Sequence, residues 1–161
     1  MSIRTVLDDR SIYSHVAALL AALWWVTHAV TLSITDVRTH RLPLRHVGTM
    51  SLGTLALLTG AAPVRFVPAL LCGLLLAGIL FLLALPRRGI GLGDAALAFP
   101  IGVALGWAGW STVPIWALAT GLLMSLTAVV LLLLRRIEWR STLPLGPFLL
   151  AAVLPALLLS P

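Results

Sequence analysis

The chain has 161 residues, of which 60% are apolar and 10% charged, and its mean hydropathy is +1.08. This composition excludes a disordered chain, which needs low hydrophobicity, and a soluble globule, which would expose large apolar patches. The single cysteine, Cys72, excludes a disulfide scaffold and a cysteine-based zinc site. The formal charge of +6 comes with eleven arginines in short clusters between apolar runs, which favours a membrane protein over a nucleic-acid-binding one.

The apolar runs along the chain predict a single all-α membrane domain over residues 1–161. Residues 1–14 form a short polar segment without a convincing signal-peptide cleavage site, so we expect the next run to be retained as a membrane span. A helix of about 20 residues crosses the ~30 Å hydrocarbon core. On this basis the sequence predicts six transmembrane helices, at residues 16–35, 46–64, 66–85, 94–109, 112–134 and 143–160.

Two of these spans come from one uncharged run of forty residues, 95–134. Such a run would measure about 60 Å as a helix, which is twice the hydrocarbon core, so we expect it to fold back once. Residues 106–112, with two Trp and two Gly, are the expected turn. The span at 46–64 is diluted by Gly, Thr and Ser, which suit close packing between helices.

The positions of the arginines predict the orientation in the membrane. Eight of the eleven lie in three alternate loops, after the first, third and fifth predicted spans: Arg38, Arg41, Arg45, Arg87, Arg88, Arg135, Arg136 and Arg140. The positive-inside rule places these loops in the cytoplasm, beside anionic lipid headgroups, and both termini outside. An even number of spans agrees with this arrangement.

Two of the five acidic residues sit where membrane helices end. Asp36 closes the first predicted span and Asp94 opens the fourth, so both are expected at the cytoplasmic face. Two apposed carboxyls share a proton: the ionised one activates water, while the protonated one hydrogen-bonds the carbonyl under attack. This is aspartyl proteolysis, and it requires neither a metal nor an organic cofactor. The alternative interpretation is a helix cap for Asp94 and a juxtamembrane flank for Asp36.

Glycines stand at alternate positions before the second aspartate. Because glycine lets backbones approach closely, an extended peptide could lie along this segment beside the carboxylate. Gly91 and Gly93 are therefore candidate substrate-binding residues.

Three segments of the chain resemble, in order, the motifs of the type IV prepilin peptidases. Residues 33–43 (SITDVRTHRLP) resemble the first motif, an Asp at a helix end followed by a basic stretch and Leu-Pro. Residues 91–97 (GLGDAAL) resemble the Gly-x-Gly-Asp motif, and residues 143–149 (LPLGPFL) resemble the Pro-Phe-Gly-Pro-Phe-Leu signature of the last helix. The first and second matches contain Asp36 and Asp94.

The resemblance implies a membrane-embedded aspartyl endopeptidase of six core helices in a prokaryotic plasma membrane, active in pilus biogenesis and protein secretion. Its substrates would be prepilin or pseudopilin precursors, each a short basic leader followed by a hydrophobic helix, and its catalytic residues would be Asp36 and Asp94. The sequence departs from the family pattern at Ala96, where Lys is usual, and at Leu44, where Asn is frequent. It also lacks the cysteine-rich, N-methylating extension of larger members, and so resembles the short, peptidase-only ones.

Two alternatives stay open at this point. The absence of the usual lysine at Ala96 is compatible with a catalytically inactive relative. A non-enzymatic pilus-assembly scaffold or small transporter would use its aspartates as helix caps or ion ligands. A transporter would want polar groups near the bilayer midplane, where the sequence places only His28 and scattered Thr and Ser.

Overall fold

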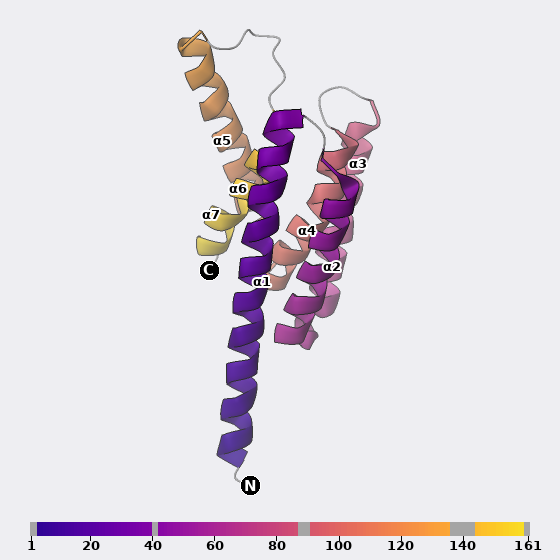
Figure 1. Cartoon of the computed structure of the whole chain (residues 1–161), viewed down its shortest axis with the longest axis vertical. Helices are drawn as coiled ribbons and strands as arrows, with labels where there is room; N and C mark the ends of the chain where they lie inside the picture. Colours follow the sequence, from indigo (N-terminus) through magenta and orange to yellow (C-terminus); the bar gives the residue numbers. More distant parts are fainter. Residues whose placement is uncertain (1–2, 40–41, 87–90, 136–143, 160–161) are drawn as a thin grey trace.

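The structure, a computed structural model, describes residues 3–39, 42–86, 91–135 and 144–159 (Figure 1). Within these ranges every regular element is a helix, as the sequence predicts. The long helices are α1 (Ile3–Thr39), α2 (Leu44–Ala61), α3 (Phe66–Ala84), α4 (Leu92–Ala108) and α5 (Thr112–Leu133). A 3-10 turn, η1 (Pro63–Arg65), joins α2 to α3, and two short helices, α6 (Gly146–Ala151) and α7 (Val153–Leu158), follow α5.

Three segments are long and apolar enough to cross a membrane: His15–Thr39, Pro63–Ala84 and Thr112–Leu133. The helix α4 is apolar but has 17 residues, and α2 has 18 residues diluted by Gly and Thr. Helix α1 is longer than its predicted span, because the polar segment from Ile3 onward is also helical and continues beyond the other helices (Figure 1).

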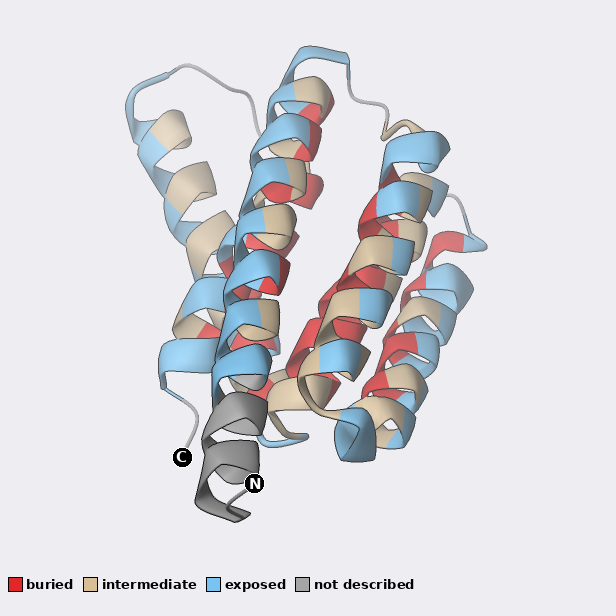
Figure 2. Ribbon diagram, turned by 60° about the horizontal axis from the view of Figure 1, so that its bottom comes forward, coloured by how far each residue is buried: buried red, intermediate tan, exposed pale blue. Residues whose placement is uncertain are grey.

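Helices α3 and α4 form the most closely packed pair, because small residues face each other across it. A Cβ built on Gly102 would lie 2.7 Å from the Cα of Gly73, and one built on Gly106 would lie 2.5 Å from the Cβ of Cys72. Small residues let helix backbones approach to van der Waals contact, which is the usual source of helix association in lipid. Figure 2 shows buried residues on the inward faces of the helices and exposed residues on the outer faces. Helix α4, with eleven buried residues, is the centre of the bundle.

The turn expected within residues 106–112 is present between α4 and α5. Gly109 has φ of +138°, a conformation that side chains rarely adopt. The hydroxyl of Thr112 donates to the carbonyl oxygens of Gly109 and Leu105, at 2.7 and 3.1 Å, and so closes the turn. The fold-back of the long uncharged run is therefore confirmed.

The last predicted span, 143–160, is not one continuous helix over its described part. It consists of α6 and α7, each of six residues, which meet at Ala152. Pro155 has no amide hydrogen to donate to the carbonyl of Ala151, so the helical hydrogen bonding is interrupted at this junction.

Candidate active site

Asp36 lies in the last turn-and-a-half of α1 and points into the bundle. The buried residues Ala29, Leu32 and Asp36 are spaced by three and four positions, which places them on one face of a helix. The other side of α1 carries exposed residues such as Val37 and Arg38. The carboxyl group is consequently only 6% exposed, although it is near a helix end.

Asp94 is the third residue of α4 and is 8% exposed. Its Oδ2 accepts a hydrogen bond of 3.0 Å from the backbone amide of Gly91, the residue that caps the helix. This is the acidic half of a capping box, which satisfies an amide left without a partner at the helix start. Asp94 thus caps the helix, as the alternative interpretation of the sequence expected. It does so from the third helical position, while Gly91 occupies the N-cap position.

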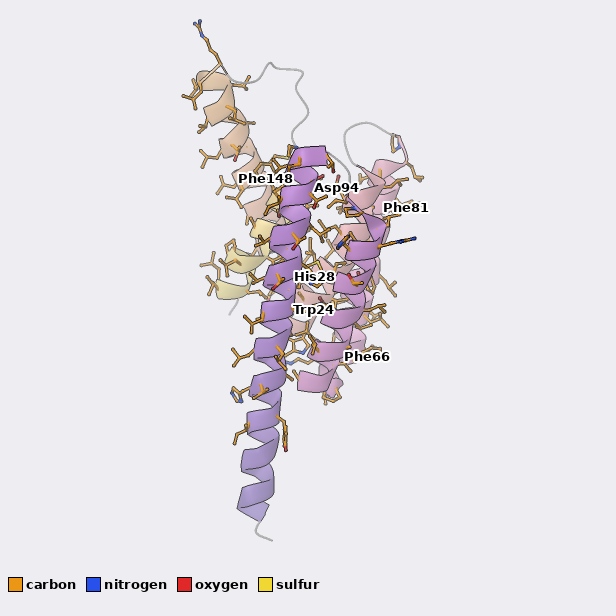
Figure 3. All side chains as sticks on the ribbon, viewed as in Figure 1. Trp24, His28, Phe66, Phe81, Asp94 and Phe148 are labelled. Carbon is orange, nitrogen blue, oxygen red and sulfur yellow. The ribbon has the colours of Figure 1, made fainter. Side chains whose placement is uncertain are left out.

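The fold brings these two carboxyls to the same end of the bundle. They are close enough for the charge of Asp36 to act on Asp94. Figure 3 shows Asp94 beside the C-terminal end of α1, while Phe66, at the start of α3, lies at the opposite end. A second carboxylate nearby disfavours ionisation of both groups together. The structure thus brings together the two carboxyls that the sequence singled out.

A third element contributes to the site through its backbone. The amide of Gly146, the first residue of α6, donates a 3.2 Å hydrogen bond to Oδ2 of Asp36, and this bond is buried. A Cβ built on Gly146 would lie 2.7 Å from the same oxygen, so any side chain at this position would displace the carboxyl. In the sequence, Gly146 is distinguished only by its place in the third motif, where a Gly-Pro pair precedes an apolar run.

The two candidate substrate-binding glycines occupy different surroundings. Gly91 is exposed at the edge of the site, where its amide already donates to Asp94. Gly93 is half-buried, and the space that a side chain would need is filled by Leu42, whose Cβ would lie 2.9 Å away. Gly93 therefore serves close packing between the loop after α1 and the start of α4.

The positions that depart from the family pattern lie near this end of the bundle. Ala96 is half-buried and packs against the apolar core, whereas Leu44 opens α2 and is 65% exposed. Only three of the eight arginines that predict the orientation are among the described residues. Arg38, Arg45 and Arg135 are exposed, while the other five lie outside the described residues: Arg41, Arg87, Arg88, Arg136 and Arg140. Among the described residues no cluster of three or more His, Cys, Asp or Glu could hold a metal ion.

Comparison with known proteins gives two matches. The sequence profile of the type IV leader peptidase family matches residues 20–159, a range that includes both aspartates and Gly146. A protein of Pseudomonas aeruginosa, described as prepilin leader peptidase/N-methyltransferase, is 35% identical over 79 residues, which cover 49% of this chain and 26% of that protein. The chain thus matches about a quarter of the length of this curated relative. No solved structure matches the chain significantly.

Proposed function

The chain belongs to the type IV leader peptidase family, and from this premise we propose that it is an integral membrane aspartyl endopeptidase that removes the basic leader of prepilin-like precursors. The observation that carries the proposal is the burial of Asp36 and Asp94, from α1 and α4, at one end of the bundle within electrostatic reach of each other. Buried acidic residues in an apolar helical bundle are costly, which favours a functional role for the pair.

In the proposed reaction the two carboxyls work as an acid and a base. The ionised carboxyl takes a proton from a water molecule, whose oxygen attacks the scissile carbonyl carbon, while the protonated carboxyl donates a hydrogen bond to the carbonyl oxygen. The tetrahedral intermediate then collapses, the C–N bond breaks, and the proton passes to the leaving amine. Because a coupled pair titrates as a unit, the two roles belong to the dyad.

Backbone amides support this chemistry by fixing one oxygen of each carboxyl. Gly91 holds Oδ2 of Asp94, and Gly146 holds Oδ2 of Asp36. A hydrogen bond from a fixed amide needs no reorganisation during the reaction, so it keeps each carboxyl in place for the attack. The exposed Gly91 borders the dyad and is the place where we expect an extended substrate to pass. Gly93 contributes to the same segment by letting it pack against Leu42.

We also propose that the chain crosses the membrane six times, with the dyad at the cytoplasmic face and both termini outside. Arg38 and Arg45, at the end of α1 and the start of α2, are exposed at the same end of the bundle as the aspartates. Arg65, between α2 and α3, is near the other end. Exposed arginines beside the dyad would meet anionic lipid headgroups there. A basic leader would then be cut at the surface where its precursor is made.

The test is leader removal in a cell that co-expresses this chain with the prepilins of the same organism. Asp36→Asn and Asp94→Asn each keep the shape of the side chain but remove its ionisable group, so each should abolish cleavage while the protein stays in the membrane. Asp9→Asn, the same change in the N-terminal segment, is the matched control and should cleave normally. Near-normal cleavage by either dyad variant would show that the assignment is wrong.

Two further measurements separate the proposal from its alternatives. EDTA should leave cleavage unchanged, because the proposed mechanism uses carboxyls alone. A wild-type protein that is present in the membrane and leaves every prepilin uncut would favour a non-catalytic relative or an assembly scaffold, to which the alanine at position 96 points.

A further inference from the structure

The loop between α1 and α2 places a leucine side chain next to both halves of the candidate site. Leu42 is half-buried and packs against the apolar core. The next residue, Pro43, has φ of −69° and ψ of 111°, and its carbonyl oxygen accepts the amides of His46 and Val47 at 2.9 and 3.2 Å. Proline fixes its own φ and restricts the residue before it, so the side chain of Leu42 projects from a rigid piece of backbone.

On one side Leu42 contacts the start of α4. A Cβ built on Gly93 would lie 2.9 Å from the Cβ of Leu42 and 3.3 Å from its Cδ1. Gly93 directly precedes Asp94 in the first turn of that helix. The turn that carries the Asp94 carboxyl therefore rests directly on Leu42.

On the other side the same leucine lies close to the start of α6. A Cβ built on Gly146 would lie 3.6 Å from Cδ1 of Leu42, in ordinary van der Waals contact. Gly146 is the residue whose amide donates to Asp36. One methyl group, Cδ1, thus lies near the segment that carries Asp94 and also near the segment that holds Asp36.

We propose that Leu42 is a positioning residue that sets the separation of the two aspartates, because its side chain fills the space between the first turns of α4 and α6. This inference rests on the proposed function of the dyad. Interiors are packed without spare volume, so removing part of this side chain lets the two turns shift into the vacated space. A displacement of about 1 Å in an active site can lower the rate by roughly 10²-fold.

The experiment measures prepilin cleavage by purified protein in liposomes for a graded series of side chains. Leu42→Met keeps the volume, Leu42→Val shortens the side chain, and Leu42→Ala removes the Cδ1 methyl group that lies near Gly146. Leu123→Ala is the matched control, because Leu123 is also half-buried and packed against the core but lies on α5. Each variant is measured for kcat, KM and the width of its pH–rate profile, since that width reports the interaction of two coupled carboxyls.

We expect Leu42→Ala to lower kcat on the order of 10- to 10²-fold, with KM within about twofold of the wild-type value. Its pH–rate profile should differ in width from that of the wild type, Leu42→Met should restore both quantities, and Leu123→Ala should change neither. The proposal is overturned if Leu42→Ala keeps wild-type kcat, or if it loses activity with a profile of unchanged width. Should Leu42→Ala fail to accumulate, Leu42→Val decides by the same criteria, with an intermediate loss expected.

Asp36→Asn and Asp94→Asn, measured beside this series, keep the two proposals distinguishable. If both are inactive while every Leu42 variant resembles the wild type, only the positioning role is wrong. If either cleaves normally, the dyad itself is wrong.

Discussion

The amide of Gly146 is hydrogen-bonded to the carboxyl of Asp36 across 110 positions of sequence. Asp94, in contrast, takes its amide from Gly91, three residues away. The two carboxyls are thus held in different ways, one by its own helix start and the other by a distant helix. The geometry of Asp36 consequently depends on how α6 docks onto α1.

Gly146→Ala should lower cleavage strongly. The added methyl group would lie 2.7 Å from Oδ2 of Asp36, so the carboxyl must move away and lengthen its hydrogen bond. We expect kcat to fall on the order of 10²-fold with the protein still folded. Gly78→Ala, on α3, is the control, because nothing lies within 4 Å of the added carbon. Equal activity of the two variants in a prepilin cleavage assay would contradict this role of Gly146.

Gly102→Val should destabilise the bundle. Its Cβ would lie 2.7 Å from the Cα of Gly73 and from the carbonyl oxygen of Cys72, and both are backbone atoms that cannot rotate away. Overpacking of this kind costs about 1–3 kcal/mol or more. Thermal unfolding in detergent should show a lower midpoint than for the wild type. Gly121→Val on α5, where the new side chain meets open space, should unfold near the wild-type temperature.

Arg65→Ala should weaken the connection between the α2–α3 turn and the end of α4. The guanidinium of Arg65 lies 5.2 Å from the ring centroid of Trp107 and donates to its carbonyl oxygen at 3.1 Å. The indole in turn donates to the carbonyl of Leu58. Because Arg65 is exposed, we expect the free energy of unfolding to fall by only about 0.5–1 kcal/mol. Cleavage should not change. Val64→Ala, next to it and 93% exposed, should leave the unfolding midpoint unchanged.

The proposed orientation predicts which positions an external reagent can reach. In a Cys72→Ala background, cysteines placed beside Gly109 and Pro63, at the exposed positions Trp110 and Val64, should react with a membrane-impermeant maleimide added to sealed cells. A cysteine at Arg88, which lies outside the described residues, should react only after the cells are opened. Labelling of position 88 from outside would show that the proposed orientation is wrong and that the dyad does not face the cytoplasm.

The all-helical fold class could be predicted from the sequence, and so could the positions of Asp36 and Asp94 near helix ends, because both depend on local chemistry. Apolar runs of sufficient length indicate membrane helices. An acidic residue at the end of such a run is unusual, because a carboxylate near the membrane is unfavourable in free energy. The helical segment of α1 that lies N-terminal to its apolar part could not be predicted from hydropathy, since hydropathy locates membrane spans and not the full length of a helix. The break between α6 and α7 lies in an evenly apolar run, where Pro155 is the residue that indicates an interruption of the helix.

The contacts that hold the dyad could not be predicted, because they join segments far apart in the chain. Leu42 and Gly146 occur in a loop and at a helix start, and nothing in the spacing of either residue indicates a neighbour. The glycines before Asp94 suggested room for a substrate, yet Gly93 instead accommodates Leu42. Only the packing of α4 and α6 against the loop distinguishes these two roles.

The hydrogen bond from Gly146 also bears on when the proposed active site is completed during biosynthesis. Ribosomes deliver the chain from the N-terminus, so α1 and α4 leave the ribosome before α6. Asp36 therefore lacks its amide donor while the chain is still emerging, although both carboxyls are already made. The proposed active site would therefore be complete only after the final helices have docked.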